Sequence, residues 1–406
     1  MDKLRHGIIA GSLIGALWMA VLAILFAVAM SFATGQGFRP SMSASLLWGA
    51  GLGVGLIYLR APLWTGLVPA VGVLLAVAAA LGLGPVVFAD GVPKVMILAV
   101  SAGLGGLFAY TQVRISDDCP PTALTRHEWE AAWIRFLTGF GYIIFTAIVV
   151  IPFYVMVMTS LKSQQALLQN PLDFSLDLSR GWDLFRSYVE LFRDFNFGSY
   201  LWTSFYISVL TVLITLAFSI PGAYAVARLR FRGRAAFSRS ILLVYMVPMI
   251  VLALPIYIVF SMVGLRNSVL GIVLIYPVTT IPVALYMLQG YFRGLPAEVE
   301  EAGLMDGLTR LQVILKITLP LSLPALASVS LYVFMIAWNE FLLAFMLLDD
   351  PSKFTLTRGV AMLNSSEIPR QHLMAGAVIA TLPIMVIFLG LERFMVKGLT
   401  AGSVKG

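Results

Sequence analysis

The stretch "EEAGLMDGLTRLQVILKITLP", residues 300–320, is polar, is interrupted by glycine, and lies between two long apolar runs. Its charged residues favour a position outside lipid, because placing a charged side chain in hydrocarbon is costly. The stretch is also too short to form a domain with its own core. The sequence therefore predicts a short, structured connection between two membrane-spanning segments.

The first part of this connection has the pattern of a short helix. Pro296 suits the first turn of a helix, where its missing N–H would have no intrahelical partner. Acidic residues follow where the positive end of the helix dipole favours carboxylates: Glu298, Glu300 and Glu301. After Asp306, Gly307 is able to take the left-handed conformation that ends a helix.

A second short helix is predicted directly after this turn. Thr309 and Gln312 have the spacing of a capping box, in which each side chain accepts from the backbone N–H of the other. Pro320 and Pro324 then restrict how the chain enters the next apolar run, because proline fixes φ and has no N–H. We therefore expect the segment at 296–320 to be a helix-turn-helix lever.

The composition of the whole chain is that of an integral membrane protein. Of its 406 residues, 60% are hydrophobic and 12% are charged, and the mean hydropathy is +0.93. A soluble protein carries roughly 25% charged residues, so most of this chain belongs in a bilayer. The net charge of +7 needs no nucleic-acid partner. The single cysteine excludes an internal disulfide, and three scattered histidines do not form a metal-binding pattern.

Apolar runs long enough to cross a membrane occur ten times in the sequence. A helix needs around 20 residues to cross roughly 30 Å of hydrocarbon. The first run also resembles a signal peptide, but its apolar core exceeds the usual length of about 7–15 residues, so we expect a retained helix. The ten expected spans lie near residues 7–34, 42–59, 63–89, 95–113, 136–160, 201–226, 240–262, 269–290, 321–346 and 372–395.

The basic residues set the expected orientation. With a cytoplasmic N-terminus and ten spans, most Lys and Arg residues fall on the cytoplasmic side, in agreement with the positive-inside rule. The clearest loop is "ARLRFRGRAAFSR", residues 227–239, which contains arginines but no acid. Topology alone explains this loop, although a site for nucleic acid or lipid headgroups is an alternative. Both termini are expected in the cytoplasm.

The chain is expected to divide at "RISDDCPPTALTRHEWEAAW", residues 114–133, where turn formers and charges gather. We predict a four-helix membrane extension at 1–113, a cytoplasmic linker at 114–135 and a six-helix core at 136–406. Glycines four residues apart in the extension would let helix backbones approach closely in lipid. They are Gly7, Gly11 and Gly15, then Gly49 with Gly53, and Gly51 with Gly55. The run "GLGVGL" at 51–56 lacks the third glycine of a nucleotide-binding loop.

The predicted lever is suited to docking on another protein, because it presents acids beside Leu304 and Met305 outside the membrane. The alternative is a well-capped connector that has no partner. The pattern E-A-(A/G)-x-x-D-G, followed by an apolar stretch and Leu-Pro, resembles the signature loop of ABC importer permeases. The matching residues are Glu301, Ala302, Gly303, Asp306, Gly307, Leu319 and Pro320. Position 303 is Gly where the family usually has Ala.

The resemblance covers roughly residues 136–406. This segment is similar to the carbohydrate-importer permeases of the maltose type, in particular to their second permease subunit. The motifs that carry it include "YVELFRDFNFGSYLWTSF", "AYAVARLRFRGR", "MVPMIVLALPIYIVF" and "AWNEFLLAF", in the order and spacing of that subfamily. The first 130 or so residues have no counterpart in its six-span members.

The resemblance implies an all-α membrane protein in which a type I ABC importer core follows a four-helix extension. Residues 297–308 would form a coupling helix that sits in a cleft of a separate ATPase, with Glu301 as an ion-pairing or hydrogen-bonding residue and Gly307 as the pivot. The chain has no G-x-x-x-x-G-K-[ST] loop. ATP and Mg²⁺ are therefore expected on the partner ATPase, with no catalytic residue, metal or cofactor in this chain.

The implied function is the transmembrane part of an ATP-driven importer of an oligosaccharide or glycoside in a bacterial inner membrane. The implied partners are a second permease subunit, two copies of a cytoplasmic ATPase, an extracytoplasmic solute-binding protein, the sugar and the lipid bilayer. The outer loop, which we define as residues 348–372, is long for a connection between spans. The family resemblance implies that the outer loop contacts the binding protein, and an inert surface loop is the alternative.

A candidate translocation path is marked by Trp338, Asn339 and Glu340. A carboxylate in a span needs a wet cavity or a partner, and a tryptophan beside polar groups is able to stack on a sugar. Trp338 would equally serve as an anchor at the membrane interface.

Two other functional classes of membrane protein remain open as alternatives. A secondary transporter would show repeated halves and ionisable residues near the midplane, and neither is evident here. A membrane structural or sensor protein would use the linker at 114–133 as a signalling element.

Overall fold

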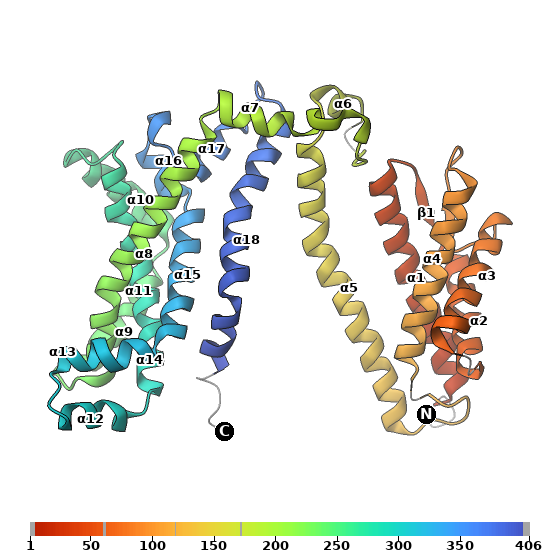
Figure 1. Ribbon diagram of the computed structural model, residues 1–406, viewed down its shortest axis with the longest axis horizontal. Helices are drawn as coiled ribbons and strands as arrows, with labels where there is room; N and C mark the ends of the chain where they lie inside the picture. The colour runs from red at the N-terminus through yellow and green to blue at the C-terminus, as the bar shows by residue number, and fades with distance from the viewer. Residues whose placement is uncertain (1–4, 60–61, 118, 171–172, 401–406) are drawn as a thin grey trace. The chain divides into compact units, whose positions relative to one another are not determined.

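The computed structural model describes residues 5–59, 62–117, 119–170 and 173–400, and these are almost entirely helical (Figure 1). Two compact units make up the chain, Met1–Gly181 and Trp182–Gly406. The division therefore falls later than the linker at 114–135. The helix after the linker, α5 (Arg126–Ser160), belongs to the first unit.

Seven helices in the described part of the chain are long and apolar enough to cross a membrane. Two helical pieces, Arg310–Leu321 and Leu323–Asn339, meet at a bend of 79° and are long and apolar enough only when taken together, so the described residues contain seven candidate spans, or eight if this bent pair is one span. Two further expected spans are represented by shorter apolar helices, so the expected count of ten is approximate. The seven are Gly7–Thr34, Leu63–Ala80, Lys94–Ile115, Arg126–Ser160, Phe197–Arg228, Val269–Gly294 and Arg370–Gly390, and the two shorter helices are Met42–Tyr58 and Met249–Met262.

The expected span at 240–262 is divided into α9 (Arg234–Tyr245) and α10 (Met249–Met262). The break falls at Pro248, which has no N–H to continue a helix and disfavours the helical conformation of the residue before it. Hydropathy alone could not locate this break, because both sides of it are apolar.

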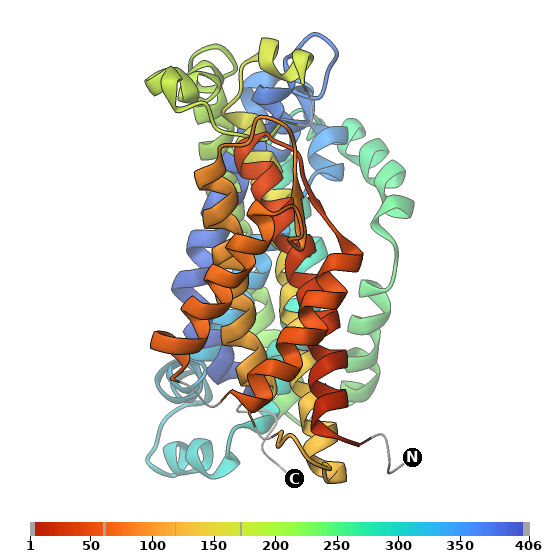
Figure 2. The ribbon, with the colours of Figure 1, turned by 90° about the vertical axis from the view of Figure 1, so that its right-hand side faces the viewer.

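The first unit is built from two helical hairpins followed by α5 (Figure 2). The first hairpin pairs α1 (Gly7–Thr34) with α2 (Met42–Tyr58), and the second pairs α3 (Val68–Ala80) with α4 (Lys94–Ile115). A short strand lies in each hairpin connection, β1 (Phe38–Pro40) and β2 (Val86–Phe88). The two strands pair antiparallel with Phe38 opposite Phe88, which joins the two hairpins at one end.

Close glycine contacts hold α1 against α2, as the sequence predicts. A Cβ added at Gly53 would lie 2.1 Å from the carbonyl oxygen of Gly11, and one added at Gly15 would lie 2.4 Å from that of Gly49. A side chain larger than hydrogen would force the two backbones apart. Gly51 and Gly55 face open space instead, so only one of the two glycine pairs on α2 serves this contact.

Replacing Gly53 by Ala is therefore expected to destabilise the first unit by about 1–3 kcal/mol, the usual cost of overpacking. The added methyl would meet backbone, which cannot rotate away as a side chain can. The loss of stability is measured as a lower thermal unfolding temperature of the purified protein in detergent. Gly51→Ala is the matched control on the same helix, and equal unfolding temperatures for the two variants would contradict the glycine contact.

The linker is ordered where it enters α5. Thr125 and Glu128 form a complete capping box at the start of this helix. The backbone N–H of Gly7 donates to the carbonyl of Thr122 at 2.9 Å, and that of Leu124 donates to the carbonyl of Arg5 at 2.9 Å. The linker thus pairs with the residues that lead into α1.

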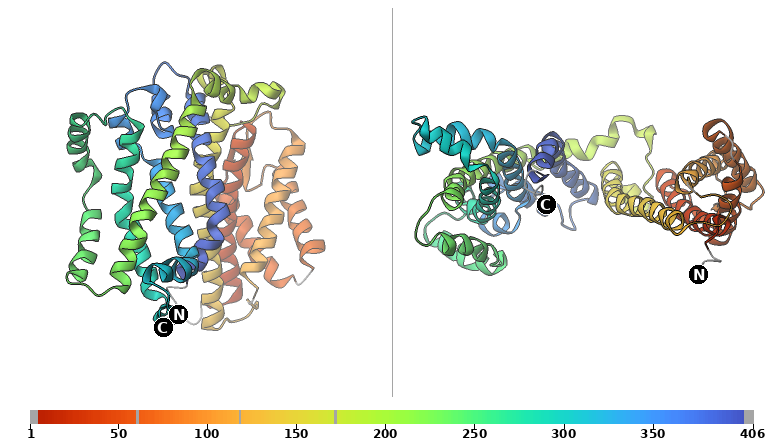
Figure 3. Two further views of the ribbon diagram at one scale, coloured as in Figure 1. Left: turned by 60° about the vertical axis from the view of Figure 1, so that its left-hand side comes forward. Right: turned by 90° about the horizontal axis from the view of Figure 1, so that it is seen from below.

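The second unit is centred on α8 (Phe197–Arg228), which packs on α11 (Val269–Gly294) and α15 (Leu323–Asn339). The last helix, α18 (Arg370–Thr400), packs on α15 (Figure 3). Buried hydroxyl groups join α8 to α11, where Thr215 Oγ1 and Thr280 Oγ1 are 2.6 Å apart.

The remaining short elements before α8 are α6 (Gln164–Gln169), the 3₁₀ segment η3 (Leu178–Phe185) and α7 (Arg186–Asp194).

Short elements gather at both ends of α11 in this unit (Figure 1). At its C-terminal end lie α12 (Ala297–Met305), α13 (Arg310–Val313), the π-helical turn η4 (Ile314–Thr318) and α14 (Leu319–Leu321). At its other end lie α16 (Leu342–Leu347), η5 (Pro351–Lys353) and α17 (Leu356–Met362), and the last two belong to the outer loop. α11 therefore connects the lever at 296–320 with the outer loop.

Candidate functional site

The lever at 296–320 has the local structure that its sequence predicts. α12 ends in a Schellman motif, in which the N–H of Gly307 donates to Leu304 at 3.1 Å and the N–H of Leu308 donates to Gly303 at 3.0 Å. Gly307 has a φ of 85°, a conformation that favours glycine. Thr309 and Gln312 form the predicted capping box at the start of α13. Two short helices with a fixed turn between them result.

One carboxylate, that of Glu300, anchors α12 to the rest of the second unit. Glu300 is 5% exposed. The Tyr224 hydroxyl donates to its Oε2 at 3.1 Å, and the Thr318 hydroxyl donates to its Oε1 at 3.0 Å. These bonds join α12 both to α8 and to the π-helical turn that follows α13.

An ion pair reinforces this anchor. Nε of Arg228, at the end of α8, lies 3.3 Å from Glu300 Oε1, and both side chains are largely buried. The same guanidinium donates through Nη2 to the carbonyl of Leu295 at 2.7 Å, just before α12 begins. A buried charge is costly unless it is paired and hydrogen-bonded, and both members of this pair meet that condition. α12 is consequently fixed to the end of α8.

Gly303 lies on the same buried face of α12 as Glu300, which is three residues earlier in the chain. A Cβ added at Gly303 would lie 2.5 Å from Cδ1 of Ile317, so the glycine lets α12 approach η4. The side chains of Leu308 and Val313 lie at 3.5 and 3.6 Å from the same point. The atom in closest contact is the flexible end of a side chain, which is able to move.

Gly303→Ala is accordingly expected to change the stability of the protein by less than about 1 kcal/mol. Alanine favours a helix by about 1 kcal/mol over glycine, and this gain offsets the cost of moving Ile317. Thermal unfolding checks the expectation. Gly303→Leu, with a branched side chain that Ile317 cannot avoid, is the comparison, and it should lower the unfolding temperature clearly.

The remaining face of α12 is open to solvent. Glu301, Ala302, Met305 and Asp306 are exposed, with Met305 at 88%. Leu304 and Leu319 are partly buried, whereas Gly307 and Pro320 are exposed. The residues that the family resemblance singles out are thus divided between a buried contact at Gly303 and a mixed acidic and apolar surface that no other described segment covers.

Sequence reasoning missed the structural role of Glu300. Three acids begin this helix, and nothing in their order distinguishes the buried one from its neighbours. The available signal was the spacing of Glu300 and Gly303, because residues three apart share one helical face. Recognising Gly303 as a close-contact position would therefore have placed Glu300 on the inner face.

The second group of candidate residues, near the end of α15, is engaged within the fold. The Trp338 indole is 3% exposed, stacks on Phe334 with ring centroids 5.5 Å apart, and donates to the carbonyl of Ala380 at 3.0 Å. Asn339 is exposed and donates to the carbonyl of Met335 at 2.9 Å. The indole of Trp338 therefore joins α15 to α18 rather than lining an open surface of this chain.

Glu340 forms a helix cap. Its carboxylate accepts from the backbone N–H groups of Leu343 at 2.9 Å and Ala344 at 3.1 Å, in the first turns of α16. A carboxylate at this end of a helix is favoured by the helix dipole and by the unpaired N–H groups there. The partner that sequence reasoning required for Glu340 is thus the backbone of the next helix.

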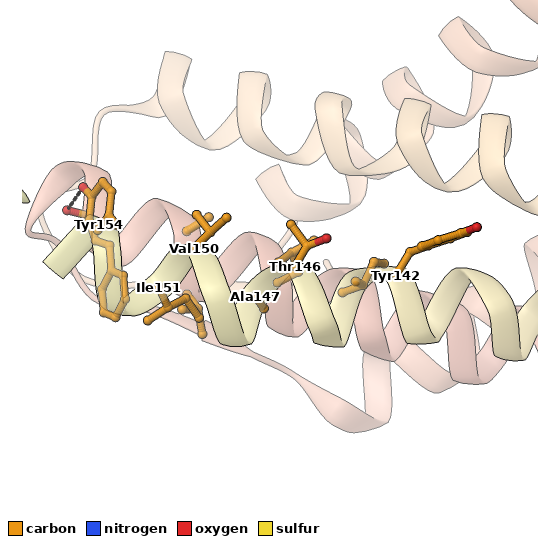
Figure 4. A pocket seen from close by; sticks show the side chains of 11 residues that line it. Tyr142, Thr146, Ala147, Val150, Ile151 and Tyr154 are labelled. Atoms are coloured by element: carbon orange, nitrogen blue, oxygen red, sulfur yellow. Dashed lines mark hydrogen bonds between the residues drawn. The ribbon is translucent and has the colours of Figure 1, made fainter. Parts of the chain in front are cut away.

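A separate cavity of about 390 Å³ lies in the first unit between α1 and α5 (Figure 4). Its lining is almost entirely apolar, with residues such as Leu25, Val28 and Ile151, and Tyr142 lies toward one end of it and Tyr154 toward the other. There the Tyr154 hydroxyl donates to the carbonyl of Phe32 at 3.1 Å. This cavity offers mainly hydrocarbon contacts, and its polar side-chain groups are the hydroxyls of Tyr142, Thr146 and Tyr154.

Comparison with known proteins adds to this geometry. Residues 219–400 match the family described as binding-protein-dependent transport system inner membrane component, and this range lies within the second unit. The chain is similar to an inner membrane ABC transporter permease protein of Escherichia coli strain K12, with 37% identity over 270 residues, 66% of this chain and 95% of the relative. It is also similar to the trehalose/maltose transport system permease protein of Thermococcus litoralis, with 34% identity over 67% of this chain and 97% of the relative.

Among solved structures, the fold is similar to that of a bacterial ABC transporter involved in the import of the acidic polysaccharide alginate. The TM-score is 0.57 at 23% sequence identity, and the similarity covers 67% of this chain and 99% of the other. The shared feature is the fold alone. About a third of this chain lies outside each of these matches.

Proposed function

This chain belongs to the family of inner membrane components of binding-protein-dependent transport systems, and we propose that it is the transmembrane permease subunit of an ATP-driven sugar importer. The sugar class is supported by relatives named for trehalose and maltose transport. Oligosaccharides or glycosides of similar size are the proposed substrates. The chain supplies the membrane path, and ATP with Mg²⁺ binds to a separate ATPase.

The observation that carries this proposal is the geometry of α12. The helix is short, lies outside the spans, and is anchored from one side through Glu300 and Arg228. Its opposite side exposes Glu301, Met305 and Asp306 together. A rigid helix that presents such a mixed surface is suited to a groove on a partner. We propose that α12 is the coupling helix, that Glu301 contacts the ATPase, and that the α12 end of the second unit is cytoplasmic.

The rest of the assembly follows from the family. We propose a complex with a second permease subunit, two copies of the ATPase and an extracytoplasmic binding protein that contacts the outer loop. Closure of the ATPase dimer would move α12, and because the anchor through Arg228 joins α12 to α8, the membrane helices would move with it. The two states of such a transporter open to opposite sides of the membrane.

The test is ATP hydrolysis by the purified complex in lipid nanodiscs. The chain is co-expressed with a second permease and an ATPase from the same organism, and a solute-binding protein from that organism is added with maltose, trehalose or sulfate. We expect the disaccharides, but not sulfate, to stimulate hydrolysis severalfold. Stimulation by sulfate alone would contradict the sugar class, and a complex that never responds to a loaded binding protein would contradict the importer.

A further inference from the structure

Asn267 ties the beginning of the outer loop to the start of α11. This residue lies between α10 and α11, two positions before α11 begins, and has a left-handed φ of 51°. Only one other described non-glycine residue, Asn196, has a positive φ. Asparagine tolerates this conformation better than most side chains, but the conformation still costs free energy, and contacts around it must hold it in place.

Asn267 uses its backbone and its side chain to bind the segment around the start of the outer loop. Its N–H donates to the carbonyl of Leu347 at 2.7 Å. Its Oδ1 accepts from the N–H groups of Asp349 at 3.2 Å and Asp350 at 3.0 Å. Its carbonyl accepts from Nζ of Lys353 at 3.0 Å. Four hydrogen bonds thus connect one residue to a segment that begins at Leu347 and lies at least 80 positions later.

Charged neighbours reinforce the contact. Arg266 Nη2 is 2.7 Å from Asp349 Oδ2, and the Arg266 guanidinium lies over the ring of Tyr257. Backbone and side-chain hydrogen bonds from Ser352 hold the pKa of Asp350 below its usual value, so this carboxylate stays charged beside Lys353. Exposed ion pairs contribute little to stability, and the hydrogen bonds of Asn267 are therefore the main connection between the beginning of the outer loop and the start of α11.

The start of α11 is packed closely against the loop before it. A Cβ added at Gly271 would lie 2.3 Å from the carbonyl oxygen of Leu265, so glycine is needed for this approach. α11 continues as one helix of 26 residues from Val269 to Gly294, with Pro277 and Pro282 inside it, and is about 39 Å long at 1.5 Å per residue. It ends three residues before α12, whose entry is held by Arg228. One helix is accordingly fixed to the outer loop at one end and to α12 at the other.

We propose that Asn267 is a positioning residue that makes the outer loop and α12 move together through α11. The proposal rests on the proposed function, in which α12 receives the movement of an ATPase. Coupling between two sites is reciprocal for binding free energies. Trapping of nucleotide in the ATPase that contacts α12 must therefore change the conformation of the outer loop. This change must depend on the hydrogen bonds of Asn267.

The experiment uses the full complex in nanodiscs with ATP, Mg²⁺ and vanadate as the probe, so that the sugar need not be known. Cys119 is replaced by Ser, and an environment-sensitive fluorophore is attached at Ser366→Cys, an exposed position of the outer loop. In the otherwise unaltered protein we expect vanadate trapping to change the fluorescence. In Asn267→Ala and Asn267→Gly the change should fall at least threefold, because both variants lack the side-chain acceptor.

Two controls separate coupling from folding. Asn267→Asp keeps an acceptor oxygen and should retain most of the fluorescence change. Asn196→Ala alters the other left-handed asparagine, whose side chain caps no helix, and should leave the response unchanged. Basal ATP hydrolysis, without binding protein, should stay within twofold in all variants.

Each result has a distinct meaning. An unaltered fluorescence change in both Asn267→Ala and Asn267→Gly would overturn the role of Asn267 while leaving the importer intact. A joint loss of the fluorescence change and of basal hydrolysis in these variants would show that Asn267 only supports the fold, and would overturn the proposal as well. No response in the unaltered complex, despite active hydrolysis, would overturn the proposed coupling of α12 itself.

Discussion

Glu300→Ala is expected to abolish sugar uptake and to lower the thermal stability of the protein. The substitution leaves the Arg228 guanidinium without its carboxylate and the hydroxyls of Tyr224 and Thr318 without their acceptor. Removing one member of a buried ion pair typically costs about 3–5 kcal/mol. α12 would lose its main connection to α8. Thermal unfolding of the isolated chain and sugar uptake by cells are the two measurements.

The matched control is the adjacent carboxylate. Glu301 is exposed, so Glu301→Ala should leave thermal unfolding of the isolated chain unchanged. If Glu301 contacts the ATPase, as proposed, the same variant should weaken ATPase binding and reduce uptake. Glu298 is the other exposed acid on α12, and Glu298→Ala should change neither. An equal loss of stability in the Glu300 and Glu301 variants would contradict the two roles assigned here.

Gly307→Pro is expected to eliminate stimulated ATP hydrolysis while the chain still folds and inserts. Proline fixes φ near −65°, whereas Gly307 has a φ of 85°. It also removes the N–H that donates to Leu304 in the Schellman motif. The local cost of about 3 kcal/mol or more should unwind the end of α12 and displace α13. Uptake, expression level and ATP hydrolysis of the complex are measured together.

A graded series distinguishes conformation from side-chain bulk at position 307. No heavy atom lies within 4 Å of a Cβ added there, so bulk alone is harmless. Gly307→Asn should be nearly neutral, because asparagine tolerates the left-handed conformation. Gly307→Ala should cost about 1–2 kcal/mol. Normal uptake by the proline variant at normal expression would show that this turn takes no part in coupling.

Local features of the lever at 296–320 could be predicted from sequence because they depend on neighbouring residues. Gly307 ends α12, and Thr309 with Gln312 caps α13. Both features follow from rules of backbone conformation and hydrogen bonding over a few positions. The membrane spans were predictable for a similar reason, because hydropathy over one segment decides them. The close approach of α1 and α2 at Gly15 and Gly53 likewise follows from small residues at a helical spacing.

Features that depend on distant residues could not be predicted. The partners of Glu300 on α8 lie more than 70 positions earlier, and no local pattern marks that contact. Trp338 was a candidate for stacking on a sugar or for anchoring at the membrane interface, but its indole is buried and donates to the carbonyl of Ala380 on α18. The open face of Gly51 has the same spacing as the packed face of Gly53. Sequence spacing reveals a helical face, whereas the neighbour against it depends on the rest of the fold.

The two kinds of contact in the lever also imply an order of events during folding. The Schellman motif and the capping box close over a few residues, so they are able to form as soon as this segment exists. The bond between Glu300 and Tyr224 closes a loop of 76 residues that includes α9, α10 and α11, and such closures carry a larger entropic cost. The local hydrogen bonds that end α12 and begin α13 would therefore form before α12 is attached to α8. Before this bond closes, α12 would have its C-terminal end defined by local contacts but would not yet be attached to α8.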